Sequence, residues 1–477
     1  MTEPCDLTAI EALAGIDSGN LSPVELYDSC VSRIEAINPA VNAIVASDIE
    51  QGRANAKRLT DSIGKGHSPG VLQGLPVGIK DLEATANLRT TWGSLEFENH
   101  VPEADDKIVA ALRRRGGNVF CKTNTPEFGA GGNTVNRVYG VTSNPFNLDK
   151  TCAGSSGGTA VALATGMLPL ATGSDYGGSL RTPAAFCGIA GFRPSPGVVP
   201  NVHSAVALSP FPVLGPMGRC VADMHLLLRA ISGCDRRDPY SVPGGAINSE
   251  LVPSSLDTLR VGWSVDMGCC PVDHCIAETF KQRIGLFTHH FKESFERAPA
   301  TDNAHTVFEV LRGVVFAAAH EERVRERRDI LGPNVIDNTE RGLALGASDI
   351  ARAHVQQSEL YRNMISYFQD ADVMITPAAA VSPFPHTELT VTRINGEKMP
   401  TYMRWLALAY VPTVTLCCSC VLPCGVDKHG MPFGIQIVGP NGSDNKVLAV
   451  AAAIEAALQS IDETARPLPD LQALQSA

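Results

Sequence analysis

The sequence predicts an α/β fold with a helical cap region, and three observations support this. Between residues 72 and 232, short apolar runs bounded by Gly and Pro alternate with helical stretches, as expected for buried strands of a sheet. Residues 235–410 carry longer helical patterns and more charge, and strand character returns in 411–477. Because the 477-residue chain has no internal repeat and no low-complexity linker, we expect one domain over residues 1–477.

The N-terminal segment, residues 1–70, is predicted to be helical. Two capping-box motifs, Thr8-Ala9-Ile10-Glu11 and Ser22-Pro23-Val24-Glu25, mark helix starts, the second with proline at the first helical position. Apolar residues follow the second motif at helical spacing, so we expect that helix to end near Asn38-Pro39.

Residues 72–232 are expected to form the core that carries the candidate functional residues. The apolar runs at 75–79, 118–121 and 168–172 predict buried strands. The stretch 107–114 predicts a helix between the first two of them.

The later segments are expected to cover and complete this core. Residues 235–410 are predicted to be a variable, mostly helical region that sets specificity, and the mixed charges of 321–328 indicate a solvated helix face. Within 411–477 we expect strands at 414–416 and 433–438, and a closing helix from about Asn445.

One uncharged segment, Trp405–Cys424, is long enough to cross a bilayer. It contains Pro412 and Pro423 with polar residues between them, which favours a helix end, a break at Pro412 and a buried strand. We therefore expect no membrane span.

The charge balance limits the partners of this protein. With 50 acidic and 39 basic side chains, the formal net charge is −11, which argues against nucleic acid or an anionic membrane as principal partner. We expect a small-molecule ligand instead. The N-terminus shows no secretion signal and 14 cysteines are few for a disulfide scaffold, so we expect a cytoplasmic protein with reduced thiols. The sequence leaves a homodimer open.

Two cysteine clusters raise the question of a metal. The four cysteines within 417–424 lack a paired C-x-x-C set and accompanying histidines, and the Cys/His group within 269–275 also departs from zinc-site spacing. Burial as small hydrophobic side chains is the favoured interpretation. We expect no metal and no cofactor.

The densest glycine and serine region holds two loops, at 152–158 and 173–183. Glycines bring backbone N–H groups close to a ligand, so either loop suits an anion or a developing oxyanion. A phosphate-binding P-loop is excluded because Thr159-Ala160 follows the last glycine where Lys-Ser or Lys-Thr is required. The dinucleotide pattern G-x-G-x-x-G is also absent.

A third interpretation of the first loop stays open. Gly154-Ser155-Ser156-Gly157-Gly158 satisfies G-x-S-x-G, which would make Ser156 the nucleophile of an α/β-hydrolase, and several histidines follow in a suitable order. Such a nucleophile should follow a strongly apolar strand, whereas residues 147–151 are polar. This alternative is therefore less favoured.

Three further motifs, at 74–81, 122–128 and 430–436, accompany the two loops. Together these segments resemble the amidase signature family of serine amide hydrolases, most weakly between about 235 and 400. The resemblance implies a single large mixed β-sheet flanked by helices. Two departures, Ala153 where a glycine is usual and Arg193 where a lysine is usual, leave the implied catalytic residues unchanged.

The resemblance implies a triad of serine, cis-serine and lysine. Residue by residue, it makes Ser179 the nucleophile, Ser155 the serine preceded by a cis peptide bond, and Lys80 the base. It also implies that Ser156 supports the loop through hydrogen bonds, with simple packing of this serine in the loop as the alternative. The segment Phe128-Gly129-Ala130-Gly131 resembles the loop that lines the acyl pocket, with core packing of Phe128 as an equally good alternative.

The chemistry of these residue types agrees with that triad. A lysine accepts a proton only when neutral, so burial must lower the pKa of Lys80 from about 10.4 toward the working pH. Apolar neighbours precede Lys80, and strand alternation directs Asp81 to the opposite face.

The loop around the nucleophile is expected to bind the carbonyl oxygen. Its backbone N–H groups predict an oxyanion hole formed by Tyr176, Gly177, Gly178 and Ser179. Asp175 and Arg181 bracket the nucleophile and predict a charge-assisted clamp that supports the loop, with two independent surface charges as the alternative.

The sequence therefore predicts a cofactor-independent amidase. It is expected to hydrolyse the C–N bond of a linear carboxylic amide through an acyl-enzyme, giving a carboxylate and ammonia or an amine, with esters and carbamates as side substrates. The alternative function is that of the glutamine-hydrolysing component of a tRNA-dependent amidotransferase complex, in which similar folds serve.

Overall fold

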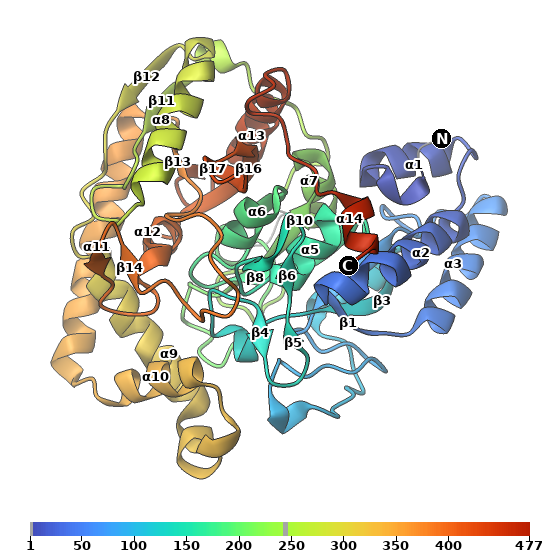
Figure 1. Ribbon diagram of the computed structural model, residues 1–477, viewed down its shortest axis with the longest axis horizontal. Coiled ribbons are helices and arrows are strands. Elements are labelled where there is room, and N and C mark those ends of the chain that lie inside the picture. The colour runs from blue at the N-terminus through green and yellow to red at the C-terminus, as the bar shows by residue number, and fades with distance from the viewer. Residues whose placement is uncertain (1–2, 242–246) are drawn as a thin grey trace.

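A mixed eleven-stranded sheet forms the centre of the molecule in the computed structural model, which describes residues 3–241 and 247–477 (Figure 1). In spatial order its strands are β1 (Ile44–Ser47), β3 (Asn118–Thr123), β2 (Pro76–Lys80), β8 (Leu170–Asp175), β10 (Val213–Gly218), β9 (Ala190–Arg193), β16 (Cys418–Val426), β17 (Pro432–Gly439), β13 (Val373–Pro377), β11 (Arg260–Trp263) and β12 (Glu293–Glu296). Parallel pairs join β2 to β3 and β8, and β11 to β12 and β13. The predicted α/β fold with a large mixed sheet is confirmed.

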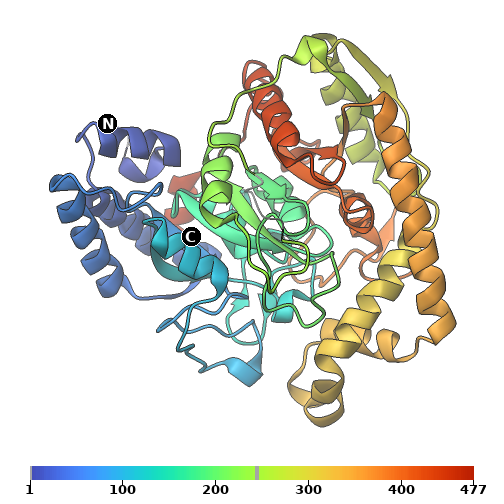
Figure 2. The same ribbon diagram turned by 180° about the vertical axis from the view of Figure 1, so that it is seen from behind.

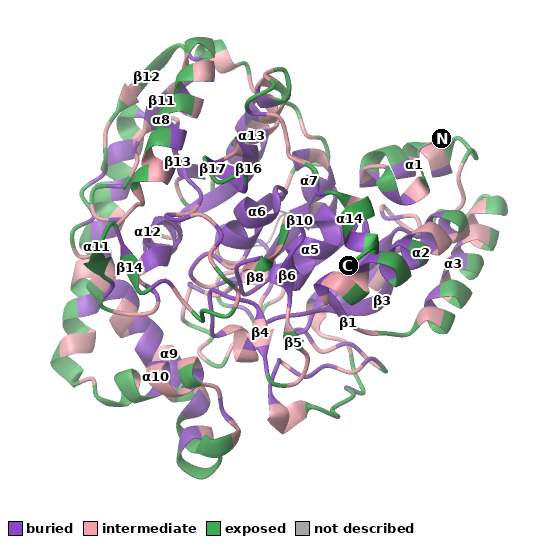
Figure 3. Ribbon diagram, in the orientation of Figure 1, coloured by how far each residue is buried: buried purple, intermediate pink, exposed green. Residues whose placement is uncertain are grey.

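Helices cover both faces of this sheet. They are α1 (Ala9–Asp17), α2 (Pro23–Val41), α3 (Ile49–Gly64), α4 (Lys107–Arg114), α5 (Gly157–Ala164), α6 (Arg181–Cys187), α7 (Val221–Ile231), α8 (His274–Phe287), α9 (Ala304–Glu326), α10 (Pro333–Leu343), α11 (Ala347–Asp370), α12 (Ala407–Val414), α13 (Asp444–Gln459) and α14 (Leu471–Gln475). The fully buried α5 and α6 lie on the face of the sheet that is turned to the viewer in Figure 1. The helices α7 and α13 lie on the opposite face, which Figure 2 shows in front. Figure 3 shows buried residues concentrated in α5, α6 and the central strands.

Short two-stranded sheets and 3₁₀ helices fill the connections. The strand pairs are β4 (Val135–Asn136) with β5 (Gly140–Val141), β6 (Ser143–Asn144) with β7 (Asn147–Thr151), and β14 (Arg393–Ile394) with β15 (Glu397–Lys398). The 3₁₀ helices are η1 (Pro4–Asp6), η2 (Leu95–Phe97), η3 (Glu127–Gly129), η4 (Leu256–Thr258), η5 (Thr288–His290), η6 (Arg328–Ile330) and η7 (Arg404–Leu406).

The predicted apolar runs of the core are confirmed as strands. The runs at 75–79, 118–121 and 168–172 correspond to β2, β3 and β8, and every residue of β2 and β3 is buried. Such complete burial explains why these parallel strands have apolar runs without alternation. The helix predicted at 107–114 is α4.

Two helix predictions need correction. The helix that starts with the Ser22 capping box continues past Pro39 to Val41. The predicted break at Pro412 is wrong, because α12 includes Pro412 and ends at Val414; the strand expected at 414–416 therefore starts only at Cys418. Proline leaves the carbonyl four residues earlier without its helical donor. Here Gln436 Nε2 donates to that oxygen, on Leu408, at 3.0 Å, which explains why the helix tolerates the proline.

Two regions predicted as mostly helical also contribute strands to the main sheet. The N-terminal segment contains β1, and residues 235–410 contain β11, β12 and β13 at the opposite edge. The long helices α9, α10 and α11 form one side of the molecule, away from α1–α3 (Figure 1). None of the helices within the described ranges combines the length and apolar character that a membrane crossing requires.

The sheet brings the predicted catalytic residues together at the carboxyl ends of two central strands. Because β2 and β8 are parallel neighbours, their carboxyl ends lie side by side. Lys80 is the last residue of β2, and Asp175 is the last residue of β8. The segment Ser155-Ser156 directly precedes α5, which packs against both strands. Three segments far apart in sequence therefore meet there.

Candidate active site

Lys80 ends β2 with its amine among three serine hydroxyls. Its Nζ lies 2.7 Å from Ser155 Oγ, 2.9 Å from Ser156 Oγ and 2.9 Å from Ser174 Oγ. The side chain is fully buried. Burial lowers the pKa of Lys80 to about 7, although the charges of Glu83 and Asp175 raise it.

The next residue, Asp81, faces a different amine. Its Oδ2 accepts a hydrogen bond of 2.6 Å from the Thr91 hydroxyl, and its Oδ1 lies 3.7 Å from Lys122 Nζ in a fully buried ion pair. This confirms that strand alternation directs Asp81 away from Lys80.

The hydroxyl network defines the direction in which a proton can move. The Ser156 hydroxyl donates to the Ser174 carbonyl oxygen at 3.3 Å, so Ser156 Oγ accepts from Lys80. A neutral amine has two N–H donors and one lone pair. When these donors serve Ser156 and Ser174, the lone pair remains for the Ser155 hydroxyl. The arrangement suits proton transfer from Ser155 to Lys80.

The backbone before Ser155 has the form that the sequence led us to expect. The peptide bond between Gly154 and Ser155 is cis. A Cβ on Gly154 would lie only 2.9 Å from the Gly131 carbonyl oxygen, so the close approach of these two backbones requires glycine.

Ser179 lies in the loop between β8 and α6, half-buried at a cavity wall that Ser155 also lines. The structure narrows the set of predicted oxyanion donors. The Gly178 N–H donates to Asp175 Oδ1 at 3.0 Å and is therefore occupied. Tyr176, Gly177 and Ser179 remain as candidate donors to a substrate carbonyl.

Asp175 anchors this loop through a buried ion network. Its carboxylate accepts from the Leu180 N–H at 3.1 Å and pairs with Arg181 at 2.9 Å and with Arg193 at 3.0 Å. Burial alone would raise the pKa of Asp175, but the two guanidinium charges and the donated hydrogen bonds hold it well below its ordinary value. Asp175 and Arg181 are thus a buried clamp and not two independent surface charges.

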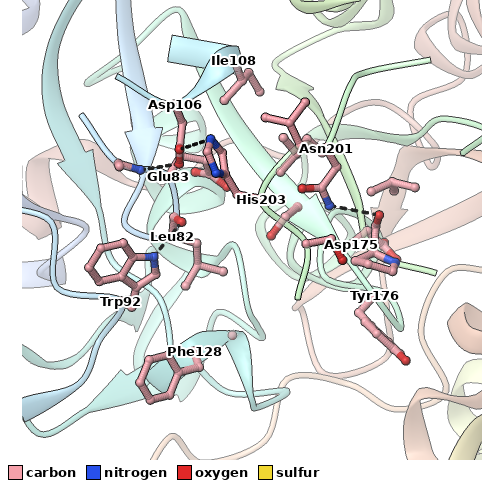
Figure 4. A pocket seen from close by; sticks show the side chains of 18 of the residues that line it. Leu82, Glu83, Trp92, Asp106, Ile108, Phe128, Asp175, Tyr176, Asn201 and His203 are labelled. Carbon is pink, nitrogen blue, oxygen red and sulfur yellow. Dashed lines mark hydrogen bonds and ion pairs between the residues drawn. The ribbon is translucent and has the colours of Figure 1, made fainter. Parts of the chain in front are cut away.

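A cavity of about 710 Å³ opens beside these residues (Figure 4). Phe128 and Gly129, two of the four predicted pocket residues, line it. Ala130 lines a separate cavity of about 230 Å³. Gly131 lies against the backbone of Gly154.

Several cavity residues were not predicted from the sequence. Three of them, Arg312, Phe316 and His320, project from α9 at spacings of four residues. That spacing alone places them on one helix face, but nothing local in the sequence shows that this face covers the serine loops. Others are Ser174, Glu83, Leu82, Trp92, Asp106 and His203.

Ten of the fourteen cysteines are buried. All four cysteines within 417–424 are buried, in or next to β16. Over the described residues, no group of three or more His, Cys, Asp or Glu side chains is arranged to hold a metal ion.

Comparison with known proteins agrees with this geometry. The family model described as Amidase matches residues 25–448. The chain is 32% identical to an acylamidase from Rhodococcus erythropolis over 456 residues, covering 94% of this chain and 95% of that protein. It is 29% identical over 468 residues to the A component of a glutamyl-tRNA(Gln) amidotransferase from Endomicrobium trichonymphae, covering 92% of this chain and 94% of that relative.

A solved structure gives the same result at the level of the fold. The crystal structure of a bacterial aryl acylamidase of the amidase signature enzymes superposes with a TM-score of 0.87 and 26% identity, covering 94% of this chain and 96% of that one. The sequence match, the superposition and the buried lysine among serine hydroxyls agree with one another. The chain belongs to the amidase family, whose members are hydrolases of carbon–nitrogen amide bonds.

Proposed function

We propose that this amidase hydrolyses linear carboxylic amides through an acyl-enzyme, with Ser179 as nucleophile, Ser155 as proton relay and Lys80 as base. The observation that carries this proposal is the Lys80 amine, fully buried and 2.7 Å from Ser155 Oγ. With the pKa of Lys80 at about 7, about half of the molecules hold a neutral base at neutral pH.

The reaction proceeds in two halves that use one proton path. Ser179 Oγ attacks the carbonyl carbon while its proton passes through Ser155 to Lys80 Nζ. The N–H groups of Tyr176, Gly177 and Ser179 stabilise the oxyanion. When the C–N bond breaks, the proton returns from Lys80 through Ser155 to the departing nitrogen. Water then attacks the acyl-enzyme by the same relay and releases the carboxylate.

Amides with an aryl group are the best candidate substrates. The relatives named acylamidase and aryl acylamidase support this choice. The cavity wall presents Trp92, Phe128 and Phe316, and its volume of about 710 Å³ suits a small molecule. Esters and carbamates present the same kind of carbonyl and are proposed as side substrates.

A serine-directed fluorophosphonate followed by peptide mapping tests the triad. We expect the label on Ser179, and we expect both Ser179→Ala and Lys80→Ala to lose anilide hydrolysis. A label on Ser156, with activity retained in Ser179→Ala, would overturn the triad in favour of the α/β-hydrolase alternative. The buried Ser156 hydroxyl, which already donates to the Ser174 carbonyl, argues against that outcome.

The second candidate function is glutamine hydrolysis within an amidotransferase complex. The similarity of this chain, over nearly its whole length, to the A components of glutamyl-tRNA(Gln) amidotransferases supports this candidate. Hydrolysis of anilides by the purified single chain supports the acylamidase proposal. Activity confined to glutamine, or dependent on added partner proteins, supports the alternative.

A further inference from the structure

Arg312 presents an uncompensated positive charge to the catalytic cavity. It projects from α9, is only 5% exposed, and lines the same cavity as Ser155 and Ser179. Its Nε donates to Asn338 Oδ1 at 2.9 Å and its Nη2 to Tyr402 OH at 3.3 Å, and both acceptors are neutral. Among the described residues, no carboxylate lies within ion-pair distance of the Arg312 guanidinium, and Nη1 has no protein acceptor.

Among the described residues, the other charged side chains of the cavity wall, except Glu83, have ion-pair partners. Their ion pairs are Asp105 with Arg113 at 2.9 Å, Lys107 with Asp235 at 3.0 Å, and Asp175 with Arg181 and Arg193, and Asp106 Oδ1 lies 3.2 Å from His203 Nε2. Burial lowers the pKa of His320 to about 4, so this histidine is neutral at neutral pH. Glu83 also has no ion-pair partner, but it would carry the opposite charge.

Three aromatic rings surround the guanidinium without neutralising it. The Arg312 Cζ lies 4.4 Å from the ring centre of Phe316, 5.0 Å from that of Tyr176 and 5.9 Å from that of Phe308. Ring faces attract a cation but replace only part of the hydration that it loses on burial. They also hold the planar group in place, and its open edge remains available to a ligand.

We propose that Arg312 binds a carboxylate of the substrate, so that the preferred substrates are amides that carry a second, non-scissile carboxylate. This inference rests on the proposed amidase function. A guanidinium matches a carboxylate through two parallel N–H donors, and such charge-assisted hydrogen bonds are the strong ones. The site is close to the reaction, because the Tyr176 ring under Arg312 belongs to the residue next to Gly177 in the nucleophile loop.

Matched pairs of substrates test this assignment, each with a carboxylate in one member and an isosteric isopropyl group in the other. One pair carries the group on the acyl side: succinanilic acid and 4-methylpentananilide. The other pair carries it on the amine side: 4-acetamidobenzoate and 4-isopropylacetanilide. We expect the wild-type enzyme to favour the anionic member of at least one pair by about tenfold or more in kcat/KM.

The variants locate the source of that preference. In Arg312→Gln the ratio of anionic to neutral kcat/KM should fall to about one, and Arg312→Lys should keep part of it. The matched control is Arg404→Gln, because Arg404 pairs with Glu309 at 2.9 Å and does not line the cavity. This control should keep the wild-type ratio.

A binding measurement separates this inference from the catalytic proposal. Calorimetric titration of Ser179→Ala with each member of a substrate pair measures the preference for the anion as a ratio of Kd values. This measurement does not depend on turnover. The inference is overturned if neither substrate pair shows a preference for the anionic member, either in kcat/KM of the wild-type enzyme or in this binding assay. It is also overturned if the preference survives in Arg312→Gln. If Arg312→Gln does not fold, Arg312→Lys carries the comparison, and an unchanged ratio there overturns the inference. Serine-dependent hydrolysis of the neutral anilides would leave the amidase proposal standing in each of these cases.

Discussion

The pKa of Lys80 determines how the proposed reaction depends on pH. A lysine with the ordinary pKa of about 10.4 would be neutral in only about 0.04% of molecules at pH 7. Burial lowers the pKa of Lys80 to about 7, so about half of the molecules hold the neutral base there. Lowering the pKa from about 10.4 to about 7 corresponds to roughly 5 kcal/mol of charging free energy at the buried site.

Acidification is therefore the first perturbation to apply. Between pH 8 and pH 5 the neutral fraction of Lys80 falls about a hundredfold, and kcat/KM for a neutral anilide should fall with it. The assay is steady-state hydrolysis of 4-methylpentananilide from pH 5 to pH 9. An acid limb centred above pH 9, or no limb over this range, would refute the assignment of Lys80 as a base tuned by burial.

A substitution at Glu83 tests the same assignment with a predicted sign. Burial raises the pKa of Glu83 to about 7, and in its ionised form this carboxylate raises the pKa of Lys80. Glu83→Gln should therefore move the acid limb to lower pH. The matched control is Glu455→Gln: burial also raises the pKa of Glu455 to about 7, but Glu455 accepts from the Val221 N–H and does not line the cavity. A shift to higher pH in Glu83→Gln, or an equal shift in the control, would contradict the electrostatic argument.

Three other substitutions have outcomes that the structure specifies. Ser179→Ala should lower kcat/KM for anilides at least about a thousandfold while the Tm measured by calorimetry stays near the wild-type value. Lys80→Met should abolish hydrolysis and raise the Tm near pH 7. Because the pKa of Lys80 is lower in the folded protein than in the unfolded chain, this gain in Tm should shrink as the pH rises from about 7 toward about 10. A gain in Tm that grows with pH would contradict this argument. Asp175→Asn should cost about 3–5 kcal/mol, because it leaves Arg181 and Arg193 unpaired in the interior, and a Tm within one degree of wild type would show that the network is not stabilising.

Some of the strands that the sequence missed are short and exposed, whereas others, such as β13, are as fully buried as the predicted strands. The strands β2, β3 and β8 are buried at nearly every position, so hydrophobicity alone marks them. By contrast, β12 has four residues, most of them exposed, at the edge of the sheet. Its position depends on parallel pairing with β11, a tertiary contact without a local sequence pattern.

The residues of the candidate active site also divide into those with a local sequence pattern and those that only tertiary contacts reveal. The residues around Ser155 and Ser179 lie in glycine-rich loops whose composition is visible locally. Arg312 lies in an ordinary helical pattern, and its proposed role rests on the absence of a counter-ion among the residues that the structure describes, which only the folded structure reveals. Glu83 likewise lies three residues after Lys80, but its burial and its lack of an ion-pair partner depend on distant segments.

The loop that contains Ser179 is also held by contacts of Arg181 with the C-terminal part of the chain. Besides Asp175, Arg181 donates to the Ala409 carbonyl oxygen at 2.6 Å and to Gln436 Oε1 at 2.8 Å. The amide nitrogen of Gln436 donates in turn to the Leu408 carbonyl that Pro412 leaves without a helical donor. The Gln436 side chain of β17 thus donates to a carbonyl oxygen of the proline-containing helix α12 and accepts a hydrogen bond from the Arg181 guanidinium. Without Thr413 and Gln436, the buried Arg181 guanidinium would have only part of its hydrogen bonds satisfied.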